Sequence, residues 1–240
     1  TYRVQASYAL NGGTRLRAAA GTGVKNPTMS ELFGFFGDFV GNPDLDPEKS
    51  RGWEVGVDQY VLGRSVLLGA TYFNSNLEGE IGSQTVLGIT TPINRIGTSH
   101  RQGVELFANA DFGKQWSIDL AYTYLDADEP AAGGGHREEI RRAKNVASAN
   151  VSWRTSDDRV GLNLNVRYNG QQRDDNFGTF PATPVTLDAF TLVNFGADWK
   201  LSEVLDIYGR VENALDEDYT EVYGYATPER AFYMGLRAGF

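Results

Sequence analysis

The sequence contains no run of about 18 apolar residues, the length that a membrane-crossing helix needs. This absence excludes an α-helical membrane protein. Cysteine is also absent, which is compatible with many cellular compartments. Basic residues are outnumbered, because 22 Lys and Arg stand against 31 Asp and Glu and give a net charge of -9 at pH 7. Phosphate binding needs a basic face, so the charge argues against a nucleic-acid partner.

Histidine is scarce as well. His100 precedes an alternating segment and His136 follows a glycine run, Gly133 to Gly135; neither has a Ser or Cys nucleophile nearby in a catalytic context. The carboxylate pairs Glu138-Glu139 and Asp157-Asp158 fall between the predicted strands, where we expect them to be solvated. The sequence therefore predicts a protein that is not an enzyme, with no catalytic residue, metal site or cofactor.

The chain shows a regular alternation of apolar and polar residues, most clearly at its end. On one side lie Phe232, Met234, Leu236, Ala238 and Phe240, and on the other lie Tyr233, Gly235, Arg237 and Gly239. A strand with one apolar face and an arginine on the other is typical of a transmembrane barrel, where one face contacts lipid and the other faces a water-filled interior. The mean hydropathy of -0.37 is compatible with such a wall, because every second residue faces inward.

The same alternation recurs in eleven segments, whose connections alternate between short turns and long loops. The long loops are predicted at residues 21–49, 78–92, 126–141, 170–186 and 213–228. Trp116, Trp153 and Trp199 each lie within a few residues of a short turn, as expected for an aromatic girdle at one membrane interface. We therefore predict an all-β, antiparallel transmembrane β-barrel in a bacterial outer membrane. A soluble β-sandwich or lectin-like barrel is the alternative, and the charged inward faces disfavour it.

An odd number of strands needs an explanation, because bacterial single-chain barrels have even counts. With eleven antiparallel strands, the first and last would run parallel at the seam. The polar inward faces also fit a wide lumen that is wet or plugged. We infer that these strands are part of a larger barrel.

Several short motifs, spread over nearly the whole chain, resemble the TonB-dependent outer-membrane transporters. They are Asn26-Pro27, Glu31-Leu32, the GNPDLDPE run from Gly41 to Glu48, Trp53 to Gly56, Gly103 to Glu105, and the segment from Val211 to Tyr219. The resemblance implies a barrel of about 22 strands, filled by an amino-terminal plug that contacts TonB. Residues 1–240 would be the carboxy-terminal half of that barrel, without the plug. We expect Asp44, Asp46 and Glu48 to be solvated turn residues rather than a metal site.

Within that family, two segments resemble the cobalamin receptors: Arg141 to Lys144, and Val222 to Tyr225 together with Arg230. The resemblance implies ligand contacts at Arg141, Phe177 and Tyr225. Phe177 stands where those receptors have a tyrosine, so a hydrogen bond from the hydroxyl would be lost. Each could instead be an ordinary rim residue, and two neighbours could serve equally, namely Tyr223 and Phe180. The inward arginines are expected to pair with plug or wall carboxylates, namely Arg154, Arg167, Arg210 and Arg237.

The expected function is uptake of cobalamin across the outer membrane, energised through TonB. A ferric-siderophore receptor of the same family is one alternative, and a structural or docking barrel without cargo is another. An outer-membrane protease or lipase is the enzyme alternative. The expected partners are the cargo, TonB through the plug, outer-membrane lipid and lipopolysaccharide, and the amino-terminal half of the barrel.

Overall fold

The computed structural model describes residues 1–131, 134–179 and 181–239; Gly133, Phe180 and Phe240 lie outside these ranges. Eleven strands form one continuous antiparallel sheet in chain order. They are β1 (Arg3–Ala9), β2 (Thr14–Lys25), β5 (Glu48–Val61), β6 (Val66–Glu78), β9 (Thr98–Phe112), β10 (Trp116–Pro130), β12 (Asn145–Arg154), β13 (Val160–Asn169), β16 (Phe190–Lys200), β17 (Leu205–Glu212) and β18 (Ala231–Ala238). A short strand, β11 (His136–Glu138), pairs with the end of β10.

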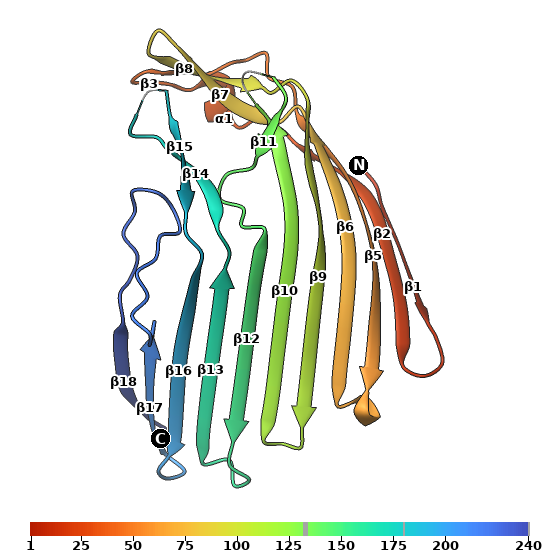
Figure 1. Cartoon of the computed structure of the whole chain (residues 1–240), viewed down its shortest axis with the longest axis vertical. Helices are drawn as coiled ribbons and strands as arrows, with labels where there is room; N and C mark the ends of the chain where they lie inside the picture. The colour runs from red at the N-terminus through yellow and green to blue at the C-terminus, as the bar shows by residue number, and fades with distance from the viewer. Residues whose placement is uncertain (132–133, 180, 240) are drawn as a thin grey trace.

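The sheet is a curved wall with different connections at its two ends (Figure 1). Short turns join the strands at the lower edge, and long connections rise above the upper edge. The predicted alternation of turns and loops is therefore confirmed. Among the described residues, β1 pairs only with β2 and β18 only with β17, so the sheet is open.

The outer face carries aromatic residues near the short turns, as the sequence predicts. Trp116 lies opposite both Phe112 and Trp153, and the two tryptophan rings are 6.3 Å apart between centroids. Trp199 lies opposite Val160, close to the same edge. These rings form part of a belt at the level where a barrel meets the membrane interface.

The inner face is polar, and many of its charged side chains form ion pairs. Asp58 is buried and accepts hydrogen bonds from Arg15 and Arg17. The four inward arginines all have carboxylate partners on the wall or its loops. This confirms the predicted pairing with wall carboxylates. The partners are Asp198 for Arg154, Glu221 for Arg167, Glu212 for Arg210 and Asp206 for Arg237, at 2.6 to 4.0 Å.

Four of the five long connections contain regular structure that the sequence pattern misses. The first holds α1 (Met29–Phe33), β3 (Phe35–Phe36) and β4 (Phe39–Val40); the second holds β7 (Ile81–Val86) and β8 (Ile89–Asn94). Together they make a small sheet in the order β3-β4-β8-β7 above the wall. The third holds the end of β10 and β11, and the fourth is a hairpin of β14 (Gln172–Asn176) and β15 (Thr183–Leu187). A 3₁₀ turn, η1 (Leu62–Arg64), lies at the opposite edge.

The helix α1 is short, and its start is set by a capping box. Thr28 accepts a hydrogen bond from the amide of Glu31, whose carboxylate in turn accepts one from the amide of Thr28. No helix among the described residues has the length and apolarity to cross a bilayer.

Glu48 is not the solvated turn residue that we expect from the sequence. Its side chain is buried and accepts hydrogen bonds from Lys25 Nζ and the amide of Ile81, both at 3.0 Å. It therefore ties the first large connection to the second. The sequence could not predict this, because Lys25 and Ile81 come close only through strand pairing.

Candidate functional site

A buried carboxylate at the loop edge of the wall joins three segments of the chain. Asp174, on β14, is fully buried. Its oxygens accept hydrogen bonds from Arg141 Nε at 2.9 Å, the amide of Tyr223 at 2.8 Å and the amide of Asp175 at 2.8 Å. Burial alone would raise the pKa of Asp174, but these donors outweigh it and hold the pKa below its usual value. The carboxylate is therefore charged at neutral pH.

Arg141 lies beside Asp174 with its backbone in the left-handed region, at φ 58°. Its amide donates to the carbonyl of Arg173 at 2.7 Å, which anchors the turn after β11 to β14. The guanidinium carbon lies 5.6 Å from the centroid of the Phe177 ring, within the range of a cation–π contact. Two of the three predicted ligand contacts, Arg141 and Phe177, are thus neighbours. The Arg141 side chain remains 40% exposed, and Phe177 is 64% exposed.

Tyr225, the third predicted contact, lies two residues beyond the amide that Asp174 holds. A turn closed by the amide of Tyr225 and the carbonyl of Val222 presents it, with Gly224 at φ 82°. Its side chain is 73% exposed, and Tyr223 is partly exposed beside it in the sequence. Both line a pocket of about 520 Å³, together with Thr186, Leu187, Asp188, Ala189, Phe190, Asp218, Tyr219, Thr220 and Gly224.

The last long connection folds back onto the wall at this pocket. The Tyr219 ring packs on Phe190 with centroids 4.7 Å apart, and Arg167 lies 5.7 Å from the Phe190 centroid. Arg167 also pairs with Glu221 at 2.6 Å. Burial and the nearby Glu221 raise the pKa of Tyr219, so its hydroxyl stays protonated at neutral pH. The pocket therefore has an aromatic lining with a polar surround.

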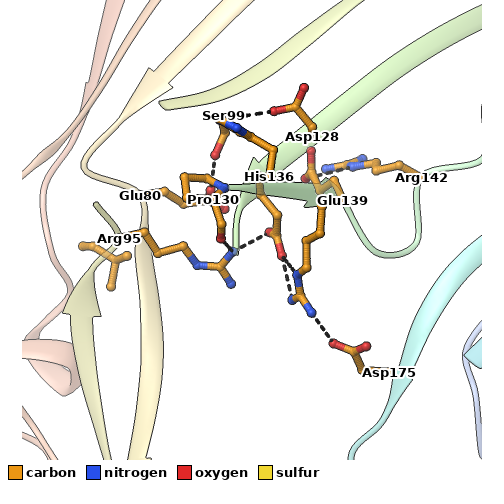
Figure 2. Close-up of polar contacts among 12 residues, drawn as sticks. Glu80, Arg95, Ser99, Asp128, Pro130, His136, Glu139, Arg142 and Asp175 are labelled. Carbon is orange, nitrogen blue, oxygen red and sulfur yellow. Dashed lines mark hydrogen bonds and ion pairs between the residues drawn. The ribbon is translucent and has the colours of Figure 1, made fainter. Parts of the chain in front are cut away.

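A network of buried carboxylates and arginines supports the site from β10 and β11 (Figure 2). Glu129 is buried and accepts from Arg95 at 2.8 Å and from Arg137 at 2.7 Å. Arg137 continues to Asp175 at 3.0 Å, next to Asp174 in the chain. The network thus connects the residue after β8 with β10, β11 and β14. Such paired and hydrogen-bonded charges favour one arrangement of the loops.

Glu139 belongs to the same supporting structure, and our expectation that it is solvated is wrong. It is 8% exposed and accepts two hydrogen bonds from Arg101, at 2.7 and 2.9 Å. Glu138 beside it is exposed and pairs with Lys144. Asp157 and Asp158 are exposed turn residues, as expected.

Sequence reasoning names the exposed members of the site and misses the buried ones. Asp174, Glu129 and Asp175 lie in connections without apolar periodicity, where a carboxylate is ordinarily solvated. The only signal is the doubled aspartate, Asp174-Asp175, just before Phe177. These carboxylates pair with arginines that lie between 8 and 38 residues away in the sequence, so no pattern within one strand could have predicted their burial.

The geometry of the wall and of its connections defines a class of protein. An antiparallel wall with an apolar, aromatic outer face, a polar inner face and elaborate connections at one edge is that of an outer-membrane β-barrel. Residues 1–214 match the family described as "TonB dependent receptor-like, beta-barrel", and the chain belongs to this family. Its members are receptors and transporters of the outer membrane rather than enzymes.

Individual relatives agree with the family. The chain is 31% identical over 240 residues to the vitamin B12 transporter BtuB of Photobacterium profundum, covering 97% of this chain and 36% of that protein. Two solved structures share its fold. One is the siderophore receptor PirA of Acinetobacter baumannii (TM-score 0.79, 19% identity, 99% of this chain, 40% of that one). The other is the pyoverdine receptor FpvA of Pseudomonas aeruginosa PAO1 (TM-score 0.79, 15% identity, 99% and 36%). The chain spans between 36% and 40% of the length of these relatives.

Proposed function

We propose that residues 1–240 form the carboxy-terminal half of the barrel of a TonB-dependent receptor that takes up cobalamin. The observation that carries this proposal is the 31% identity to a vitamin B12 transporter, which extends over 97% of the chain. The eleven strands would be completed by a similar number from the amino-terminal half, because a barrel in lipid needs every strand edge paired. No bond is made or broken in the proposed activity.

The exposed aromatic side chains at the loop edge suit a bulky ring ligand. Tyr225 and Phe177 expose most of their surfaces, so a ligand that covers them would remove apolar area from water. The Asp174 carboxylate holds together the segments that carry these two aromatic residues. Asp174 lies on the same hairpin as Phe177, and it accepts hydrogen bonds from Arg141 and from the amide of Tyr223, two residues before Tyr225. Arg141 would add hydrogen-bond donors for the amide oxygens of a corrin.

The charge of the pocket favours a neutral cargo over an anionic one. Its described lining includes Asp188 and Asp218 and no lysine or arginine. Ferric siderophores that bind iron through catecholates are anionic, and this pocket would repel them. A corrin with neutral amide side chains meets no such penalty. A ferric-siderophore receptor is nevertheless the second candidate, because the siderophore receptor PirA and the pyoverdine receptor FpvA share the fold of this chain.

The other proposed partners are those that this half of the barrel would contact in a complete receptor. The plug would fill the lumen and contact the polar inner face, and TonB would act on the plug. Outer-membrane lipid and lipopolysaccharide would contact the apolar outer face and its upper rim. A docking barrel without cargo would share all of these contacts except the ligand.

Uptake of radiolabelled cobalamin by cells that lack their own receptor tests the proposal. The gene for the complete receptor should restore uptake, and a protonophore or loss of TonB should abolish it. Uptake of iron-55 as a ferric siderophore, measured in the same cells, should stay at background. Iron uptake without cobalamin uptake would favour the second candidate, and transport of neither would favour a docking barrel.

A further inference from the structure

Two histidines and an aspartate meet on three neighbouring strands near the loop edge. Asp128 on β10 lies directly opposite His100 on β9. His136 on β11 lies opposite Pro130, which is two residues from Asp128 and therefore points its side chain to the same face. One ligand atom from each of the three side chains lies within 4.8 Å of the others.

This cluster is separate from the cargo pocket. Asp128 shares its strand face with Trp116, Leu120 and Tyr124, which belong to the apolar outer side of β10, whereas Glu129 points to the inner side. The unbroken register between β9 and β10 keeps this alternation intact up to His100. The three side chains thus lie on the outer side of the wall, near its upper rim.

One oxygen of Asp128 lacks a hydrogen-bond partner. Asp128 Oδ1 is shielded from solvent and accepts no hydrogen bond from any described residue. His136 Nε2 lies 3.7 Å from this oxygen, which is too long for a hydrogen bond (Figure 2). A shielded carboxylate oxygen without a partner is costly, and a bound cation would remove that cost.

His100 keeps one ring nitrogen available to a cation. His100 Nδ1 lies 2.8 Å from Asn76 Oδ1; because that oxygen only accepts, Nδ1 carries the proton and Nε2 presents its lone pair. Ligating histidines in proteins are commonly held in this way by a partner on the other ring nitrogen. The two imidazole rings are 5.5 Å apart between centroids.

We propose that His100, Asp128 and His136 bind a divalent transition-metal ion of the Zn²⁺ type. Two imidazoles and one carboxylate suit Zn²⁺ better than Ca²⁺ or Mg²⁺, which prefer oxygen ligands. Ligand atoms of a tetrahedral ion with bonds of about 2.1 Å are roughly 3.4 Å apart. The observed 3.7 Å between His136 Nε2 and Asp128 Oδ1 is close to that spacing. On binding, His136 Nε2 would lose the proton that it donates to the carbonyl of Thr98, with Nδ1 of the same ring carrying the proton instead, and water would take the fourth position.

The ion would hold β11 to the wall. β11 has only three residues, and its pairing with β10 is the contact that continues the sheet there. A metal that joins His136 to His100 and Asp128 would tie this short strand across β10 to β9. Added Zn²⁺ should therefore raise the midpoint of thermal unfolding, because it binds only the folded arrangement.

Zinc binding to the complete receptor, purified in detergent without a polyhistidine tag, tests the proposal directly. Competition with a chromogenic chelator should show one high-affinity Zn²⁺ per protein. His100→Asn, Asp128→Asn and His136→Gln should each weaken binding by about tenfold or more. Asp126→Asn is the matched control, because Asp126 lies on the same strand and face without belonging to the cluster, and it should leave the affinity unchanged. Equal affinity in all variants, or no bound zinc in the wild type, would overturn the proposal.

Copper in place of zinc gives a second readout that depends on ligand identity. The electron paramagnetic resonance spectrum of wild-type protein with one equivalent of Cu²⁺ should show coupling to two imidazole nitrogens. His100→Asn should reduce this coupling to one nitrogen. A wild-type spectrum without nitrogen coupling would contradict the assignment even if a variant failed to fold. Both measurements are independent of cobalamin, so the metal site and the proposed function can fail separately.

Discussion

At the residue scale, the Asp174 carboxylate is the group on which the loop-edge site depends. It is fully buried and takes one hydrogen bond from Arg141 and one from the amide of Tyr223, so it joins two of the segments proposed to bind cargo. A buried carboxylate is stable only with such donors, and a donor without the carboxylate would itself be left unsatisfied. The positions of Arg141 and Tyr223 are therefore coupled.

Replacing this carboxylate should loosen the site locally. We expect Asp174→Asn to lower the free energy of local opening at the Tyr223 amide by about 1.5–3 kcal/mol, because its hydrogen bond to a charged acceptor is lost. Hydrogen exchange of that amide, followed by mass spectrometry, measures the change. Asp157→Asn, in an exposed turn at the opposite edge, is the matched control and should have no effect on it. Unchanged protection in Asp174→Asn would show that the turn is held by other contacts.

The lowered pKa of Asp174 gives this coupling a defined dependence on pH. Its stabilising contribution should be complete above the ordinary aspartate pKa of about 3.9 and should be lost as the pH falls through the lower folded-state value. Protection of the Tyr223 amide, corrected for intrinsic exchange, should be constant from pH 7 to about 5 and fall only in stronger acid. In Asp174→Asn this acid-dependent loss should disappear. A loss that begins near neutral pH would contradict the predicted shift.

The sequence predicts the exposed residues of the site better than the buried ones. Arg141, Phe177 and Tyr225 could be named from the sequence, because a family resemblance marks the segments that contain them, and the structure places Arg141 beside Phe177. Their role as ligand contacts stays a prediction. Asp174 and Glu139 could not be named, since Asp174 pairs with Arg141, 33 residues away, and Glu139 with Arg101, 38 residues away.

At the element scale, strand pairing sets aromatic rings across from glycines. Gly69 on β6 lies directly opposite Phe107 on β9, and Gly103 on β9 lies opposite Phe73 on β6. A Cβ atom at Gly69 would lie 2.0 Å from the Phe107 ring, so the ring occupies the space that a side chain would need. Glycine at these positions allows the two strands to twist while the ring covers the backbone.

A side chain at Gly69 should therefore destabilise the β6–β9 pairing. We expect Gly69→Ala to cost about 1–3 kcal/mol through overpacking, and Gly69→Ala with Phe107→Ala to recover part of that loss. Urea unfolding of the purified receptor in detergent, followed by tryptophan fluorescence, gives the free energies. Strict additivity of the two substitutions would mean that the ring and the glycine do not interact.

The wall strands could be predicted because their alternation has a period of two and each strand is long enough to show it. The strands above the wall could not, because β3 and β4 have two residues each and the β14 sequence, QRDDN, is entirely polar. β3 with β4, β7 with β8 and β14 with β15 form local hairpins, and a single parallel bridge between β4 and β8 joins the first two hairpins. Local sequence contains little information about such contacts.

At the scale of the whole molecule, the two ends of the wall face different environments. Trp116, Trp153 and Trp199 lie on the outer face near the short turns, and the ion-pair network lies at the other edge. An aromatic belt belongs at the level of the lipid headgroups, where its rings are partly apolar and partly hydrated. Outer-membrane barrels have their short turns on the periplasmic side, so the short turns are assigned to the periplasm and the proposed binding site to the outside of the cell.

The depth of these tryptophans can be measured. In vesicles, lipids brominated near the headgroup should quench the fluorescence of a Trp53→Phe receptor more strongly than lipids brominated at the chain ends. We use Trp53→Phe because Trp53 lies far from the short turns, opposite Asn74 on β6. Tryptophans elsewhere in the complete receptor would be replaced in the same way. Stronger quenching from the chain ends would contradict the assigned position of these tryptophans at the membrane interface.

Equilibrium binding of radiolabelled cobalamin to outer membranes that contain the complete receptor tests the central claim most directly. We predict saturable binding by the wild type and affinities about tenfold weaker, or about 1.4 kcal/mol, for Arg141→Ala and for Tyr225→Ala. Arg159→Ala, in an exposed turn at the periplasmic edge, should bind as the wild type does. Absence of saturable binding by the wild type, or unchanged affinity in both site variants, would contradict the account.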